Sequence, residues 1–107
     1  MTHITLREEQ LLLAVLQQGD QAYLVALKKH LSSVLGLHWT VGAIHKPLKH
    51  LEEAGLLSSK LGEATAKRGG RAKKIYAVTE KGMRALAERK RQHDALWASF
   101  QQTEWAR

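Results

Sequence analysis

Residues 40–61 have the sequence TVGAIHKPLKHLEEAGLLSSKL. Apolar residues recur here every three or four positions, which predicts a helix. One buried stripe is expected, formed by Val41, Ile44, Leu48 and Leu51. The opposite side carries Gly42, Ala43, Lys46, Lys49, His50 and Glu53. Thr40 can cap the start of this helix, and Gly55 can end it.

Two strands are expected after this helix. Apolar and polar residues alternate over residues 57–61 and again over residues 73–78, as they do in half-buried strands. The segment between them contains Gly69-Gly70 together with Lys67, Arg68 and Arg71. This composition predicts a hairpin with a long, exposed, cationic tip.

Upstream of residue 40, two further helices are predicted. Thr5 and Glu8 have the spacing of a capping box, so the first helix should start near Leu6 and end at Gly19. Asp20 is a plausible N-cap for the second helix, which Gly36 should close. Its expected buried residues are Leu24, Leu27, Leu31 and Val34.

A long last helix should follow the hairpin. Thr79 can cap it, and it should run from Glu80 to about Glu104, a length of roughly 37 Å. Such a helix overhangs a small domain, so its apolar side needs another chain, as does the apolar surface of the first helix. The residues expected at a symmetric dimer interface are Leu12, Leu13, Leu16, Met83, Leu86, Leu96, Trp97 and Phe100.

Composition narrows the class of protein. A chain of 107 residues has room for one hydrophobic core. It contains no Cys, which excludes disulfides and thiolate zinc sites, and its N-terminus and hydropathy predict neither a signal peptide nor a membrane span. We therefore expect a cytoplasmic protein.

Its net charge of +7 favours a polyanionic partner. Nucleic acid is the first candidate for this partner, and an acidic membrane surface is the second.

The basic residues are concentrated in two parts of the chain. Residues 21–51 contain four Lys and no acidic residue, and residues 54–79 contain six Lys or Arg against Glu63. These are the second and third helices and the hairpin. The order helix, helix, helix, basic hairpin is that of a winged helix, in which the same elements face DNA.

Residues 40–59, together with GGRAKKIYAVTEKG over residues 69–82, resemble the PadR family of bacterial transcriptional regulators. The shared positions are Leu48, Leu51, Glu52, Gly55, Leu56, Gly70, Arg71, Tyr76, Thr79 and Gly82. His45 stands where the family usually has a Tyr that approaches the DNA backbone, and only Tyr23 remains of a frequent His-Gly-Tyr pattern. The resemblance implies a mostly helical winged helix-turn-helix domain over residues 1–79 and a dimerisation helix over residues 80–107.

The resemblance also implies a function. We expect a homodimeric repressor that binds a palindromic operator in double-stranded DNA, with the third helix in the major groove. The expected DNA-binding residues are Lys28, Lys29, Thr40, His45, Lys46, Lys49, His50, Lys67, Arg68, Arg71, Lys73 and Lys74. Some short family members bind flat aromatic molecules at the dimer interface, which makes Trp97 and Phe100 a candidate effector pocket, although simple interface packing is the more common use of such residues.

Other functions receive less support from the residues. The six His residues include no His-Glu-x-x-His or i, i+4 pair, and no phosphate loop or nucleophile elbow is present. We therefore expect neither an enzyme nor a metal site nor a cofactor. The alternative to DNA binding is a winged helix that docks onto another protein, and retention on non-specific DNA at low salt separates the two.

Overall fold

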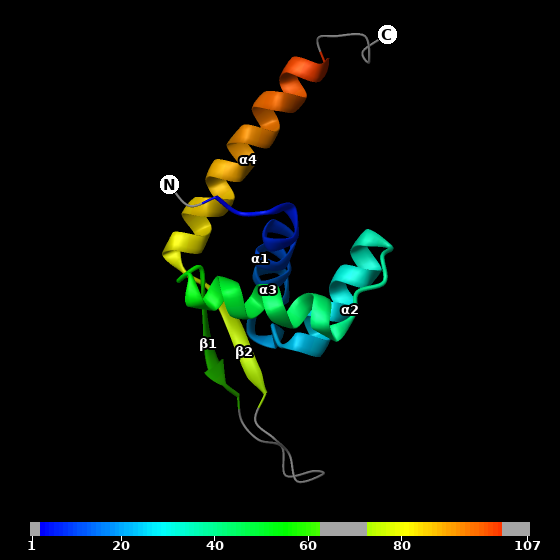
Figure 1. Cartoon of the computed structure of the whole chain (residues 1–107), viewed down its shortest axis with the longest axis vertical. Helices are drawn as coiled ribbons and strands as arrows, with labels where there is room; N and C mark the ends of the chain where they lie inside the picture. The colour runs from blue at the N-terminus through cyan, green and yellow to red at the C-terminus, as the bar shows by residue number, and fades with distance from the viewer. Residues whose placement is uncertain (1–2, 63–72, 102–107) are drawn as a thin grey trace.

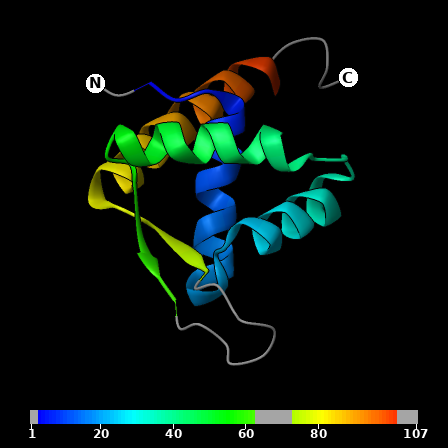
Figure 2. The ribbon, with the colours of Figure 1, turned by 60° about the horizontal axis from the view of Figure 1, so that its bottom comes forward.

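A computed structural model describes residues 3–62 and 73–101 of the chain. Its elements are α1 (Leu6–Gln18), the 3₁₀ turn η1 (Gly19–Gln21), α2 (Leu24–Leu35), α3 (Val41–Glu53), β1 (Leu57–Leu61), β2 (Lys74–Val78) and α4 (Glu80–Gln101). The strands β1 and β2 pair antiparallel, with Ser59 opposite Tyr76, and form the wing. In Figures 1 and 2, α2 lies on one side of α1, the wing lies on the other, and α3 crosses α1. The predicted winged helix-turn-helix fold is confirmed.

The core lies where the three helices and the wing meet. Its fully buried large side chains are Leu11, Leu12, Leu27, Ile44, Leu48 and Leu51. Full burial of one such side chain contributes about 1.5–3 kcal/mol to stability. The core therefore fixes which side of α3 faces inward and which side is left for solvent.

Three threonines cap helices as the sequence predicts. Thr5 forms the capping box with Glu8 at the start of α1. At the start of α3, the Thr40 hydroxyl accepts a hydrogen bond from the Ala43 amide at 3.1 Å. The Thr79 hydroxyl accepts one from the Gly82 amide at 3.1 Å at the start of α4. Each cap satisfies a backbone donor that has no partner within its helix.

The predicted start of the second helix is wrong. Asp20 lies in η1, and α2 begins only at Leu24, with Tyr23 as an N-cap whose side chain forms no capping hydrogen bond. The reason is tertiary: the Ala22 carbonyl accepts a hydrogen bond from the Tyr76 amide of β2 at 2.9 Å, and Ala22 is fully buried. This contact holds residue 22 out of a helix.

Two residues predicted to be buried are exposed. Val34 is 63% exposed and Val41 is 48% exposed. Val34 lies near the end of α2 and Val41 is the first residue of α3, so both flank the connection over residues 36–40. In that connection Trp39 enters the core instead and is only 4% exposed.

The helix α4 begins against the winged-helix body and then leaves it. Ala85 and Leu86 are buried, whereas every residue from 91 to 100 is exposed. Figure 1 shows α4 projecting away from the other elements. The overhang predicted for this helix is therefore present over the residues that the structure describes.

Candidate nucleic-acid interface

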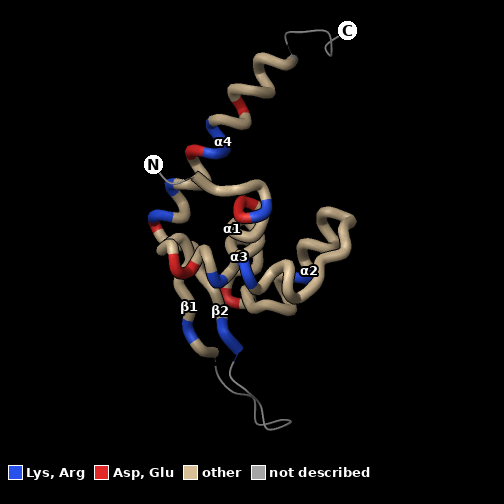
Figure 3. Tube along the Cα trace, viewed as in Figure 1, with Lys and Arg blue, Asp and Glu red and all other residues tan. Residues whose placement is uncertain are grey.

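The outward side of α3 carries most of the candidate DNA contacts. Because Ile44, Leu48 and Leu51 face the core, the residues on the opposite side face solvent. Thr40, Gly42, His45, Lys46, Lys49 and His50 are all exposed. Figure 3 shows the basic residues of α3, together with basic residues at the ends of β1 and β2 away from α4.

A hollow of about 460 Å³ lies between α3 and the wing, and we name it the wing-side flank. Its lining residues are Tyr23, Leu24, Val25, His45, Lys73, Lys74 and Tyr76. The Lys73 ammonium lies 4.0 Å from the centre of the Tyr23 ring, a cation–π contact that holds this charge at the edge of the hollow. The flank joins residues of α2, α3 and β2.

An ion pair connects α3 to the wing at this flank. Lys74 Nζ donates to Glu52 Oε1 at 2.7 Å, and the Ser59 hydroxyl donates to the other carboxylate oxygen. These hydrogen bonds, first from Lys74 and then from Ser59, lower the pKa of Glu52, and the bond to Glu52 raises the pKa of Lys74. Lys74 is thus partly neutralised within the chain, whereas Lys73 forms no ion pair with any described residue.

A second hollow, of about 380 Å³, lies on the other side of α3, and we name it the α1-side flank. Its lining residues are Thr5, Arg7, Glu8, Lys46, Pro47 and His50. The Glu8 carboxylate accepts hydrogen bonds from the Thr5 amide and from His50 Nδ1, both at 2.8 Å. Burial raises the pKa of Glu8, but the bonds from Thr5 and His50 outweigh burial and lower this pKa below its ordinary value.

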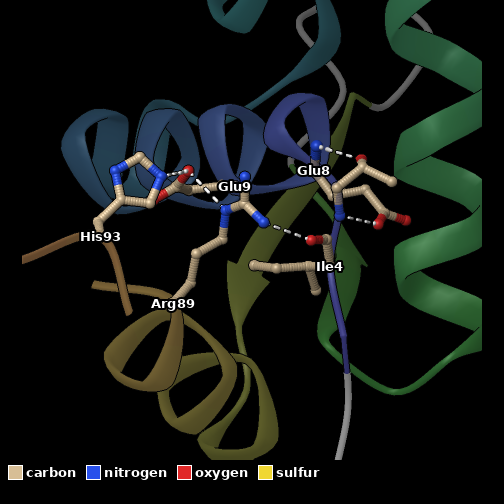
Figure 4. Close-up of polar contacts among 6 residues, drawn as sticks. Ile4, Glu8, Glu9, Arg89 and His93 are labelled. Carbon is tan, nitrogen blue, oxygen red and sulfur yellow. Dashed lines mark hydrogen bonds and ion pairs between the residues drawn. The ribbon is translucent and has the colours of Figure 1, made fainter. Parts of the chain in front are cut away.

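The first turn of α1 is also tied to α4. Arg89 Nε donates to Glu9 Oε1 at 2.8 Å, and Arg89 Nη1 donates to the Ile4 carbonyl at 2.7 Å. His93 Nε2 lies 3.8 Å from the same Glu9 oxygen. Figure 4 shows Arg89 and His93 reaching from α4 toward α1. Two adjacent residues of α1 therefore contact different helices: Glu8 contacts α3, and Glu9 contacts α4.

The predicted DNA-binding residues fall into four groups. Those of α3 share one exposed side, and Lys73 and Lys74 line the wing-side flank. Lys29 of α2 is exposed and Lys28 is half-buried. Lys67, Arg68 and Arg71 lie outside the described residues.

Two basic residues at this surface, Arg7 and the exposed Lys60 of β1, were not among the predicted DNA-binding residues. Arg7 lies beside α3, with its guanidinium carbon 4.8 Å from the centre of the Trp39 ring. It occurs in an N-terminal segment that is acidic overall, so charge distribution along the chain gave no signal for it. Only packing of α1 beside α3 brings this charge to the candidate interface.

The predicted dimer residues are only partly available to a second chain. Leu12 is 0% exposed and Leu86 is 8% exposed, because both side chains fill the protomer's own core. Neither side chain is therefore available to a second chain. The other six are 40–72% exposed: Leu13, Leu16, Met83, Leu96, Trp97 and Phe100. The exposed set lies on α1 and α4, the two helices that the sequence indicated.

In the described part of the chain, His, Asp and Glu residues form no group of three or more that could hold a metal ion. None of the described helices combines the length and apolarity needed to cross a membrane.

A winged helix with an exposed basic side on its third helix, α3, is typical of DNA-binding proteins. The family model described as the transcriptional regulator PadR-like family matches residues 12–88. The chain belongs to this family, and it is therefore a DNA-binding transcription regulator and not an enzyme. No curated protein matches the chain in sequence.

Solved structures of regulators have the same fold. A PadR-like transcription factor from Bacteroides fragilis has a TM-score of 0.71 and 24% identity, with 87% of this chain and 86% of that chain covered. A PadR family transcriptional regulator from Eggerthella lenta has a TM-score of 0.68 and 28% identity, with coverage of 91% and 83%. A PadR family regulator from Clostridium difficile has a TM-score of 0.68 and 21% identity, with coverage of 89% and 95%.

Proposed function

We propose that this protein is a homodimeric repressor that binds a palindromic operator in the cytoplasm. The observation that carries the proposal is the exposed basic side of α3, flanked by a second basic element, the wing. In this proposal the winged-helix domain, residues 1–79, binds DNA, and residues 80–107 join the two copies. Two domains held in this way present two recognition helices to successive major grooves.

The chemistry of the side chains assigns their roles. Thr40, Lys46, Lys49 and His50 approach base edges and nearby phosphates in the major groove. His45, Lys28, Lys29, Lys73 and Lys74 contact phosphates. The three basic residues of the connecting segment, Lys67, Arg68 and Arg71, are proposed to contact phosphates or a narrow minor groove. Contacts to phosphate position the protein, and contacts to bases select the sequence.

The dimer proposal rests on the apolar side of α4. Trp97 and Phe100 follow the buried Leu86 by about three and four helical turns, so they continue the side that packs against α1. Beyond the body, that side is uncovered: Leu96 is 72% exposed and Trp97 is 55% exposed. A second copy would cover this surface and the exposed Leu13 and Leu16 of α1.

A flat aromatic effector is proposed to bind at the same place. The Trp97 and Phe100 rings stack with centroids 5.7 Å apart and an interplanar angle of 9°. A planar molecule can extend such a stack at the dimer interface. Quenching of Trp fluorescence by planar aromatic compounds, lost in Trp97→Leu, tests this role, and retained quenching in that variant contradicts it.

Selection of bound sequences from a random DNA pool tests the main proposal. A palindrome with half-sites about 10 base pairs apart is expected. If each copy neutralises three or four phosphates, log K should fall with log salt at a slope of about −5 to −7. Lys49→Ala should change the selected sequence, whereas Arg84→Ala, an exposed α4 control paired with Glu80, should not.

Two outcomes would overturn this proposal. Binding without sequence preference and with a slope near zero would favour a protein-binding module. If the wild-type protein sediments as a monomer, and Leu96→Asp leaves its sedimentation coefficient unchanged, the dimer is excluded.

A further inference from the structure

We propose that Arg7 and Lys46, beside His50, form a second phosphate-binding edge, which holds the DNA backbone on the side of α3 away from the wing. This inference rests on the proposed binding of duplex DNA. It assigns a DNA contact to α1, outside the recognition helix and the wing.

The geometry separates two edges of α3. At about 100° per residue, His45 and Glu52 lie on one edge of the outward side, and His50 lies on the other. The contacts agree with this division, because His45 lines the wing-side flank and Glu52 pairs with Lys74, whereas His50 lines the α1-side flank. Lys46 lies between the edges and also lines the α1-side flank. A duplex seated on α3 therefore faces both flanks.

The charge of the α1-side flank favours an anion. Neither Arg7 nor Lys46 forms an ion pair with any described residue, and both are exposed. Among the described residues that line the flank, the only carboxylate is that of Glu8, whose side chain is 11% exposed and already accepts bonds from Thr5 and His50. The Glu8 carboxylate is therefore hydrogen-bonded within the chain, and Arg7 and Lys46 outnumber it at the flank. The uncompensated charge at the flank is positive.

Arg7 is held in place before any ligand arrives. Its guanidinium lies over the ring of Trp39, which is 4% exposed and fixed in the core. The first turn of α1 is held in turn by Arg89, which bonds both Glu9 and the Ile4 carbonyl (Figure 4). A preorganised cation loses little side-chain entropy when it binds phosphate. An arginine is also suited to this contact because its planar fork matches phosphate oxygens.

The occupant is a backbone phosphate of duplex DNA. The hollow opens beside exposed α3 residues, and its free charges come from Arg7 and Lys46, which belong to different elements. A phosphodiester chain passing along α3 can meet both charges at successive positions. Contacts of this kind carry no sequence information, so they should raise affinity for all sequences equally.

The test compares salt dependence of duplex binding for the wild type, Arg7→Gln, Arg7→Lys and the control Arg84→Gln. Each phosphate contact contributes about −0.9 to the slope of log K against log salt, so loss of Arg7 from both copies of a dimer should reduce the slope by about 2. Arg7→Lys should retain the slope, because it keeps the charge. Arg84→Gln should also retain it, since Arg84 lies on α4 and pairs with Glu80.

An unchanged slope in Arg7→Gln, with the wild type bound to DNA, would overturn this inference and leave the proposed function standing. Absence of salt-dependent DNA binding by the wild type would instead refute the proposed function. Ethylation interference on the wild-type complex gives a second measurement that does not depend on a stable variant. It should detect sensitive phosphates on both edges of α3, and sensitivity on the wing edge alone would contradict the inference.

Discussion

The two flanks of α3 are held to the body of the protein by different chemistry. On the wing side, Glu52 pairs with Lys74, and their side chains are 30% and 48% exposed. On the α1 side, Glu8 is 11% exposed and accepts hydrogen bonds from the Thr5 amide and from His50, whose own side chain is 72% exposed. An ion pair in contact with water contributes little, because solvent and salt screen it. Because Glu8 also closes the capping box of α1, its hydrogen bonds should contribute more to stability than those of Glu52.

Replacing Glu8 should have the largest effect. Glu8→Ala removes one half of the capping box and the acceptor for His50, so the free energy of unfolding should fall by about 1–3 kcal/mol. Urea denaturation measures this loss. Glu53→Ala, at an exposed position of α3, is the control and should change little. Equal losses in the two variants would remove the distinction between the flanks.

Acid should weaken the α1 side through the same carboxyl group. The pKa of Glu8 is lower in the folded chain than its ordinary value of 4.5, so the unfolded chain binds protons more readily. The stabilisation by Glu8 is complete above pH 4.5 and is lost as pH falls through the lower folded pKa.

Urea midpoints between pH 7 and pH 3 should therefore decline less steeply in Glu8→Gln than in the wild type. Glu53→Gln provides the matched comparison. A decline identical in Glu8→Gln and the wild type would show that this carboxyl group does not link folding to pH.

Replacing Gly42 tests whether the outward side of α3 contacts DNA closely. A Cβ added at Gly42 meets nothing within 4 Å in the free chain, so Gly42→Ala should raise the free energy of unfolding by up to about 1 kcal/mol. In the proposed complex the added methyl group faces the duplex, and affinity should fall. Thermal melting and DNA titration of one variant measure both changes. Increased stability with unchanged affinity would place the first turn of α3 away from DNA.

Replacing Glu52 should have the smallest effect. Because the pair with Lys74 is partly exposed, Glu52→Ala should lower the free energy of unfolding by no more than about 1 kcal/mol. The same change frees the Lys74 ammonium for phosphate, so DNA affinity at low salt should rise slightly. A loss larger than that of Glu8→Ala would reverse the comparison of the flanks.

Local sequence signals predicted most element boundaries. Thr5, Thr40 and Thr79 cap the helices they were expected to cap, because a cap is made by residues adjacent in the chain. The start of α2 could not be predicted in this way, since the Ala22 carbonyl is held by Tyr76 from β2. A signal 54 residues away in the chain is invisible to local capping rules.

The part of the candidate site that lies on a single helix could be predicted from the sequence. The spacing of Ile44, Leu48 and Leu51 identified the buried side of α3, and thereby Lys46 and Lys49 on the exposed side. Arg7 was not predictable, because its place beside α3 depends on how α1 and α3 pack.

The amino-acid sequence by itself determined the order of the helices and strands, the main buried side of each helix and the position of the basic hairpin. These features depend on residue spacing and on contacts between near neighbours in the chain. Only the tertiary structure decided that Leu12 and Leu86 belong to the protomer's own core, that Glu8 holds His50, and that Arg7 adjoins the recognition helix. Such contacts join residues far apart in the chain, and their geometry is set by packing of the whole core.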